Sequence, residues 1–324
     1  MLDKQLNPDF LNDFLNYSIV ILNKSENTVK EYNYDLNSFL KFIKIHFNLT
    51  NEEDFSKIMI NDLELSDLKK IKLEDLHSYL AYITKKNKLQ PATRARKVAS
   101  LKSFFNYLTA KTNKLKINPA QNLETPKIGK RIPKYLTFEE SKNLLNVSRS
   151  EVDRNNERDF AIITIFLNCG MRLSELVNIS MKDIKFDTKA LTVIGKGNKE
   201  RTIYLNTACM NAIEDYIKVR PKDGVKFNSK DALFLSERKE RISNRTVQCI
   251  VKKELQRAGL DTTKYSVHKL RHTAATLMYK YGHVDIRALQ ELLGHSSIST
   301  TEIYTHVDNE QVRSAVEMNP LADL

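Results

Sequence analysis

The chain has few of the residues that interrupt helices, and it has no tryptophan. Among its 324 residues only 8 are Gly and 7 are Pro, whereas Tyr and Phe number 13 and 14. Glycine and proline are the commonest residues of turns and helix ends. Their scarcity predicts a mainly helical protein. The length predicts two domains, because one domain commonly holds roughly 100–200 residues.

Cysteines and long apolar runs are also scarce. The 3 cysteines are Cys169, Cys209 and Cys249, an odd count without paired spacing. This argues against a disulfide framework and fits a reducing cytoplasm. The longest strongly apolar run, 161–167, is too short to cross a bilayer. Residues 1–8 do not resemble a signal peptide. We therefore expect a cytoplasmic protein with no membrane contact.

Acidic residues are absent from a long part of the first half. The whole chain has 52 Lys and Arg against 40 Asp and Glu, a net charge of +12. Residues 76–123 contain ten Lys or Arg and no acid. Arg94, Arg96, Lys97 and Lys102 fall within one predicted helix, 93–108. Such a surface favours contact with nucleic acid phosphates. The alternative is a helix face that is merely solvated.

The sequence predicts a boundary between two domains. Residues 122–133 have the composition of an extended linker, because they contain prolines and basic residues, including Lys130 and Arg131. Both basic residues are candidate DNA contacts. Thr137, followed three residues later by Glu140, then predicts a capping box at the start of a new helix. We therefore expect a helical first domain, 1–121, a linker, 122–133, and a second domain, 134–324.

The second domain contains one hairpin among helices. Two β-prone runs, 190–194 and 201–205, are separated by a turn with two glycines and Lys196. Residues with helical periodicity flank the hairpin at 160–170, 174–178, 206–219, 244–258, 268–281 and 286–293. The predicted fold class is mainly α with a small antiparallel β-sheet: a helical first domain and a mixed α/β second domain.

Four short segments could carry chemistry, although each alone is compatible with ordinary surface residues. Arg172 follows Gly170 at a predicted helix start, where an arginine and free amides both favour an anion. Lys196 sits at the hairpin turn. His268 and Arg271 share a helix face. His268 and His272 have metal-ligand spacing, but no Glu follows His268 and no Cys-x-x-Cys is nearby, so no metal site is predicted.

The fourth segment, taken together with the other three, indicates a function. It contains Gly294-His295 and, nine residues after His295, Tyr304. In order and approximate spacing, the set resembles the tyrosine recombinase (phage integrase) family: Arg172, Lys196, His268-x-x-Arg271, His295 and Tyr304. In the first domain, Asn27-Thr28, Tyr32, Asp35-Leu36 and Phe39 resemble the helical core-binding domain of that family. The two-domain length is similar to that of the Xer branch.

The resemblance implies a site-specific recombinase that joins DNA to Tyr304 as a 3′-phosphotyrosine and exchanges strands through a Holliday junction. Arg172 and Arg271 would clamp the phosphate, and His268 and His295 would donate hydrogen bonds or handle the tyrosine proton. Lys196 would be the general acid. Glu175 would orient the active-site cations, and His272 would support the site without reacting. No cofactor is implied, because arginines and lysine supply the positive charge.

The resemblance also implies partners: double-stranded DNA at a specific site, and a homotetramer or paired recombinases, with a DNA translocase as a further candidate activator. Apolar residues after Tyr304, in 309–324, predict a tail that docks on a neighbouring protomer. The biological role is Xer-like chromosome dimer resolution or, alternatively, integration or inversion of a mobile element. A helical DNA-binding regulator without enzymatic activity is the alternative of another class, and a type IB topoisomerase is a closer one.

Overall fold

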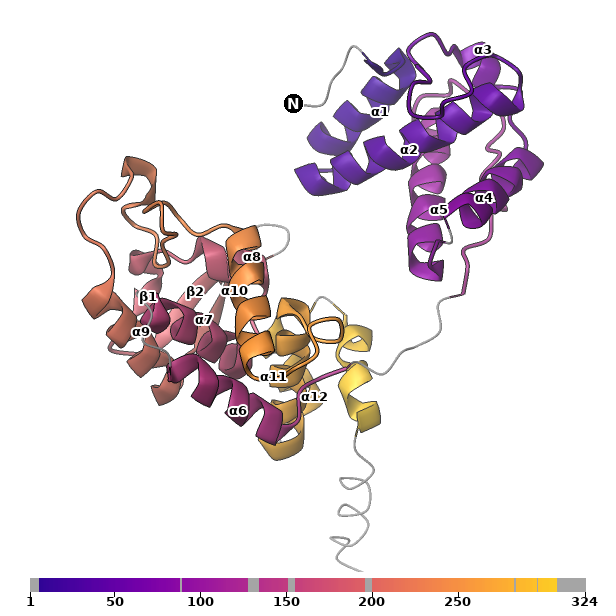
Figure 1. Ribbon diagram of the computed structural model, residues 1–324. Coiled ribbons are helices and arrows are strands. Elements are labelled where there is room, and N and C mark those ends of the chain that lie inside the picture. The colour runs from indigo at the N-terminus through magenta and orange to yellow at the C-terminus, as the bar shows by residue number, and fades with distance from the viewer. Residues whose placement is uncertain are drawn as a thin grey trace, which may run out of the picture. The chain divides into compact units, whose positions relative to one another are not determined.

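The computed structural model describes residues 6–87, 89–127, 134–150, 155–195, 200–282, 284–295 and 297–307. The chain forms two compact units, Met1–Lys130 and Arg131–Leu324, each with its own core (Figure 1). Helices predominate, and the described strands form one small antiparallel sheet in the second unit. The predicted fold class is therefore confirmed. Among the described residues, no helix combines the length and apolarity needed to cross a bilayer.

The first unit is helical. Its helices are α1 (Asp9–Val20), α2 (Glu26–His46), α3 (Leu65–Leu68), α4 (Leu73–Asn87) and α5 (Pro91–Asn106), and a π-helical turn, Tyr107–Lys111, follows α5. The long helix α2 contacts α1, α4 and α5 (Figure 1). Ser25 caps α2 by accepting a hydrogen bond from the amide of Thr28. Pro91 is the first residue of α5, where its missing N–H costs no hydrogen bond.

Aromatic rings fill the core of this unit. Phe14 meets Phe104 edge-on with ring centroids 5.4 Å apart, and Phe39 meets Tyr79 in the same way at 5.2 Å. Leu123 is buried in the same core. The second residue of the segment predicted as a linker, 122–133, therefore packs in the first unit.

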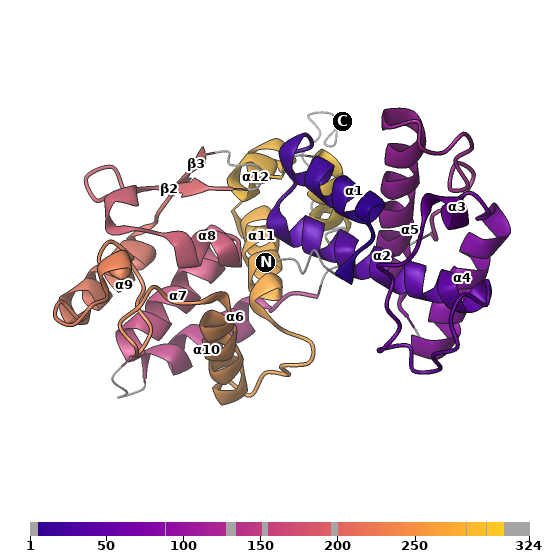
Figure 2. The same cartoon turned by 90° about the horizontal axis from the view of Figure 1, so that it is seen from above.

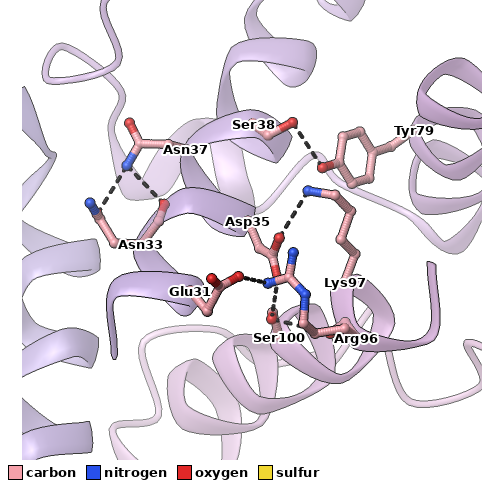
Figure 3. A network of polar contacts seen from close by, with 9 residues as sticks. All are labelled: Glu31, Asn33, Asp35, Asn37, Ser38, Tyr79, Arg96, Lys97 and Ser100. Carbon is pink, nitrogen blue, oxygen red and sulfur yellow. Dashed lines mark hydrogen bonds and ion pairs between the residues drawn. The ribbon is translucent and has the colours of Figure 1, made fainter. Parts of the chain in front are cut away.

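An ionic network holds α2 against α5 (Figure 3). The Asp35 carboxylate on α2 accepts hydrogen bonds from the Lys97 amine at 2.9 Å, from the Arg96 guanidinium at 2.7 Å and from the Ser100 hydroxyl at 2.8 Å. Arg96 also pairs with Glu31. The Asp35 side chain is only 2% exposed, so its charge is neutralised by basic groups of α5 rather than by water.

The network bears on one sequence prediction. The Lys97 side chain is 6% exposed and its amine is paired with Asp35, which argues against the predicted DNA contact by Lys97. A buried carboxylate without a cationic partner would be strongly destabilising, whereas a DNA phosphate is solvated and does not depend on this lysine. Arg96 is 37% exposed, and its guanidinium is shared between Glu31 and Asp35. It stays a predicted DNA contact.

The second unit has more elements. They are α6 (Phe138–Arg149), α7 (Asn156–Cys169), α8 (Leu173–Asn178), β1 (Ile184–Lys185), β2 (Ala190–Ile194), β3 (Glu200–Tyr204), α9 (Thr207–Val219), α10 (Asn244–Arg257), α11 (Val267–Tyr281) and α12 (Ile286–Leu293). Short 3-10 helices follow at Ile298–Thr300 and Glu302–Val307. The capping box predicted at Thr137 is confirmed, because Thr137 and Glu140 exchange hydrogen bonds at 3.1 and 2.7 Å.

The hairpin and helix α7 organise this unit. β2 and β3 pair antiparallel with Ala190 opposite Tyr204 and Ile194 opposite Glu200, as the hairpin prediction requires. β1, which the sequence did not predict, pairs with β2. Helix α7 packs mainly against α6, α9 and α11, so it lies at the centre of the helices of this unit (Figure 2). Residues 161–167 of α7 are all buried, and the helix ends at Cys169, three residues before Arg172.

Candidate active site

A cleft in the second unit collects four of the predicted catalytic residues. Its volume is about 820 Å³, and Arg172, His268, Arg271 and His295 line it. They come from three places: the start of α8, the first turns of α11 and the second residue after the end of α12. Segments almost 100 residues apart in sequence, at 172 and at 268–271, therefore meet at one surface. Lys196 lies outside the described residues.

Arg172 is aimed by the helix that it begins. It is the N-cap of α8, and its backbone amide donates a hydrogen bond to Glu175 Oε2 at 2.7 Å. Its Nη1 donates to Glu175 Oε1 at 2.8 Å, and its Nη2 donates to the carbonyl oxygen of Gly294 at 2.6 Å. Burial alone would raise the pKa of Glu175, but hydrogen bonds from Arg201 and Arg172 hold that pKa below its ordinary value. Glu175 is therefore ionised and fixes Arg172.

Arg271 is held between two helix ends. Its Nη1 donates to the carbonyl oxygen of Gly170 at 2.7 Å, and its Nη2 donates to that of Leu293 at 2.6 Å. Gly170 ends α7 with a φ of +57°, and a Cβ there would lie 3.1 Å from Leu293 Cδ2, so glycine allows the two ends to approach. Burial, followed by the charge of Arg172, lowers the pKa of Arg271 to about 10. It remains a cation at neutral pH.

A third arginine, which the sequence reasoning missed, joins this group. Arg201 on β3 donates from Nη2 to Glu175 Oε2 at 2.9 Å and from Nη1 to the carbonyl oxygen of Leu292. The only sequence signal was its place on a strand, five residues after Lys196. Arg201 does not line the cleft. Its contacts are with residues 26 and 91 positions away, which no local pattern reveals.

The histidines of the site are uncharged at neutral pH. Burial, followed by the charges of Arg271 and Arg172, lowers the pKa of His295 to about 4. His295 Nδ1 is 3.0 Å from the hydroxyl of Thr301. Burial likewise lowers the pKa of His268. The rings of His268 and His272 meet edge-on with centroids 4.5 Å apart. Imidazoles in this state can accept a proton or donate a hydrogen bond, depending on the tautomer.

Tyr304 is next to the site, because it contacts His272, but it does not line the cleft. It is 1% exposed and packs with Ala275, Leu289 and Leu293. Its hydroxyl is 2.7 Å from Nδ1 of His272. Burial raises the pKa of Tyr304 to about 12, so the phenol keeps its proton at neutral pH. His272, predicted as a supporting residue, is the direct partner of the predicted nucleophile. Burial and His268 lower the pKa of His272 to about 3.

Other residues of the cleft come from α10. This helix exposes Arg245, Gln248 and Lys252, and all three line the cleft. The three lie on one face of the helix, since they are spaced by three and four residues. The sequence reasoning did not single them out, because a lysine- and arginine-containing amphipathic helix is common on any basic protein. Only their place beside Arg172 and His268 distinguishes them.

The remaining predicted DNA contacts are in or near the first unit. Arg94 and Lys102 are partly exposed residues of α5. Lys130, Arg131 and the whole predicted tail, 309–324, lie outside the described residues. Within the described part of the chain, no group of three or more His, Cys, Asp or Glu side chains is arranged to hold a metal ion.

Comparisons with known proteins match both units. The family described as "Phage integrase family" matches residues 134–311. The family described as "Phage integrase, N-terminal SAM-like domain" matches residues 53–112. A curated relative, tyrosine recombinase XerC of Caldanaerobacter subterraneus subsp. tengcongensis, is 56% identical over 97% of this chain and 88% of its own length. Tyrosine recombinase XerC of Leptospira interrogans serogroup Icterohaemorrhagiae serovar copenhageni is 33% identical over 93% of this chain and 89% of its own length.

Solved structures give the same fold. The crystal structure of XerA recombinase is 27% identical, with a TM-score of 0.51 over 96% of this chain and 98% of that one. The XerH site-specific recombinase, bound to a palindromic difH substrate in a post-cleavage complex, has a TM-score of 0.70 at 24% identity over 98% of both chains.

Proposed function

The chain belongs to the phage integrase family of tyrosine recombinases, and we propose that Tyr304 is the residue through which it cuts and rejoins DNA. The observation that carries this proposal is the convergence of Arg172, Arg271, His268 and His295 on one cleft. Two guanidinium groups and two imidazoles can donate hydrogen bonds to the negative charge that a phosphate develops in the transition state. Tyr304 is the adjoining nucleophile, hydrogen-bonded to a histidine.

The chemistry is a transesterification. The Tyr304 oxygen forms a bond to phosphorus while the bond from phosphorus to the 5′ oxygen breaks, leaving a 3′-phosphotyrosine. The phenol proton passes to a neutral histidine of the site, and the 5′ oxygen receives a proton from Lys196. Because the phosphoester energy is kept in the tyrosine link, a 5′ hydroxyl from another strand can reverse the step and rejoin the DNA.

Arg172 and Arg271 stabilise the negative charge that gathers on the non-bridging oxygens. Each is fixed by carbonyl groups of the protein before substrate arrives, so little reorganisation is needed when the phosphate enters. The low pKa values of His268 and His295 support roles as neutral hydrogen-bond donors or proton acceptors rather than as additional cations.

Tyr304 must move before it can react. In the structure its hydroxyl is held by His272 and its ring is buried, whereas the cleft is lined by the other residues. The short helix Glu302–Val307 carries Tyr304 and follows a turn at Thr301. We infer that this segment shifts when DNA binds, and that the described conformation is a resting one.

The substrate that fits this site is double-stranded DNA at a specific sequence. The net charge of +12 and the α10 residues Arg245, Gln248 and Lys252 support it. XerH, a neighbour in fold, is bound to a difH substrate in its structure. We propose that a homotetramer, or a pair of recombinases, acts on two sites in the cytoplasm. Chromosome dimer resolution is the proposed role, because curated relatives that match more than nine tenths of this chain are XerC proteins. A DNA translocase is a candidate activator.

Substitution of Tyr304 by Phe tests the proposal, since it removes only the nucleophilic oxygen. A duplex with a nick near the recombination site traps the covalent intermediate, because the released short strand diffuses away. The wild type should form a denaturant-resistant adduct, and Tyr304→Phe should bind the same DNA and form none. If the wild type binds but never forms an adduct, the protein is a DNA-binding regulator instead. Relaxation of any supercoiled DNA without a specific site would indicate a topoisomerase.

A further inference from the structure

Three arginines share the carbonyl groups at the end of α12. Leu292, Leu293 and Gly294 are consecutive, and their carbonyl oxygens accept hydrogen bonds from Arg201, Arg271 and Arg172 respectively. Two of these arginines line the cleft, and Arg201 does not. We propose that Arg201 is a positioning residue, which holds Glu175 and the end of α12 in register so that Arg172 points at the scissile phosphate. This inference rests on the proposed function of the cleft.

The first contact of Arg201 is a hydrogen bond to Glu175, which gives this buried carboxylate its second cationic partner. The carboxylate is 1% exposed, and its Oε1 is used by Arg172 Nη1. Its Oε2 accepts from the Arg172 backbone amide at 2.7 Å and from Arg201 Nη2 at 2.9 Å. Removing Arg201 would leave a buried carboxylate with one cation instead of two, which raises the cost of its charge. The carboxylate would then turn or become protonated, and Arg172 would lose a fixed partner.

The second contact of Arg201 holds the turn that leads to His295. The last carbonyl groups of a helix have no N–H partner within the helix and form the negative end of its dipole. Arg201 Nη1 binds one of them, at Leu292. Gly294 leaves the helix with a φ of +62°, and a Cβ there would lie 2.9 Å from Arg201 Cδ. The Arg201 side chain thus lies directly against the turn whose next residue is His295.

One planar side chain therefore joins two elements that each carry a cleft residue. Glu175 is on α8, which Arg172 begins, and Leu292 is on α12, which His295 follows. The Arg201 side chain is 14% exposed, and its Nε is buried without a hydrogen-bond partner among the described residues. An arginine fork can span both acceptors, whereas a lysine amine cannot bridge them in the same geometry. Arg201 acts on the phosphate only through its neighbours.

A substrate without the phosphate charge separates positioning from general stability. Replacing one non-bridging oxygen of the scissile phosphate with methyl gives a neutral methylphosphonate, on which the clamp of Arg172 has less charge to stabilise. A defect that arises from a displaced Arg172 should shrink on this substrate. A defect from poor folding should be equal on both substrates.

The test compares Arg201→Gln and Arg201→Lys with wild type on the nicked phosphate duplex and on its methylphosphonate counterpart. On phosphate, we expect both variants to cleave roughly 100-fold more slowly, the order expected when a catalytic group is misplaced by about 1 Å. DNA affinity should be unchanged. On methylphosphonate, both variants should cleave at close to the wild-type rate. Arg172→Gln should show the same substrate pattern.

Arg220→Gln is the matched control, because Arg220 also binds carbonyl groups, those of Lys230, Ala232 and Leu233. It should lower the melting temperature without any difference between the two substrates. The inference is overturned if Arg201→Gln loses activity equally on both substrates, if it loses none, or if Arg201→Lys has full activity. If the wild type forms no adduct on either duplex, the proposed function itself has failed, which is a distinguishable result.

Discussion

At the scale of single residues, burial decides the protonation state of the groups around Tyr304. The pKa of Tyr304 is raised to about 12, and those of His272 and His295 are lowered to about 3 and 4. A neutral phenol beside neutral imidazoles needs no counter-ion, which explains how an apolar cluster of Ala275, Leu289 and Leu293 can enclose it. The Tyr304 oxygen is therefore protonated and shielded from water in this structure.

This state makes the catalytic unit sensitive to acid. His272 takes up a proton near its ordinary pKa of 6.5 when unfolded, but only near 3 when folded. Between these values the unfolded chain binds more protons than the folded chain. The contribution of neutral His272 to stability is therefore fully present above about pH 6.5 and is lost progressively as the pH is lowered. The slope is at most about 1.4 kcal/mol per pH unit for one group.

We therefore expect the melting temperature to fall less between pH 7.5 and 5 in His272→Gln than in the wild type, measured by calorimetry. His77→Gln, at an exposed histidine of α4, controls for the loss of an imidazole as such. Parallel pH profiles for His272→Gln and the wild type would contradict the assigned state.

At the scale of elements, one side of α5 packs against the rest of the first unit, and another side is partly exposed to solvent. Lys97 and Ser100 bind Asp35, whereas Lys102 is only half-buried. We expect Lys97→Met to lower the free energy of unfolding by about 1–3 kcal/mol, because a buried carboxylate loses a partner. The salt dependence of DNA binding should not change.

Lys102→Met is the matched variant on the same helix. It should leave stability nearly unchanged and reduce the log–log salt slope of DNA binding by about 0.9, the value for one phosphate contact. Chemical denaturation and binding titrations at several salt concentrations measure both quantities. An altered salt slope in Lys97→Met together with unchanged stability would mean that Lys97 contacts DNA after all.

The second element with a clear prediction is α10. Because Arg245 is exposed and lines the cleft, we expect it to contact a base edge or a phosphate near the cleavage position. Arg245→Ala should cost about 1–3 kcal/mol of discrimination if the contact is to a base. Selection of binding sites from a randomised duplex library reads this out as relaxed preference at one position. An unchanged sequence profile with unchanged affinity would exclude α10 from the DNA interface.

Elements and motifs differed in how well the sequence predicted them. Local sequence patterns predicted α12 at its observed bounds and the β2–β3 hairpin with its second strand shifted by one residue, at 201–205 instead of Glu200–Tyr204. β1 has two residues, too few for any pattern. Lys97 and Arg201 could not be understood locally, since their carboxylate partners, Asp35 and Glu175, are 62 and 26 residues away. The cationic motifs were visible in the sequence, but the groups that fix them were not.

At the scale of the whole molecule, we expect the two units to bring different surfaces to one DNA substrate. The first would contribute the partly exposed basic residues of α5, and the second would contribute the cleft. Strand exchange also needs neighbouring protomers, and the apolar residues of 309–324 are the proposed link. This segment lies outside the described residues, so its role is predicted from Val312, Ala315, Val316 and Leu321 in the sequence.

Deletion of residues 309–324 should leave binding to a single site largely intact, because the cleft and both cores precede them. Pairing of two sites should be lost, since each protomer would lack its contact to the next. Native gels with two duplexes of different length distinguish bound from paired DNA, and a plasmid assay measures recombination. Wild-type recombination by the truncated protein would show that the tail is not the link.

The central claim is that Tyr304 becomes covalently attached to DNA, and peptide mapping of the trapped adduct tests it most directly. The wild type is reacted with a nicked duplex, digested with nuclease and protease, and the modified peptide is sequenced by mass spectrometry. The account predicts one modified peptide, with a 3′-linked nucleotide on Tyr304. A nucleotide attached to any of the other 12 tyrosines, or to a serine, would contradict it.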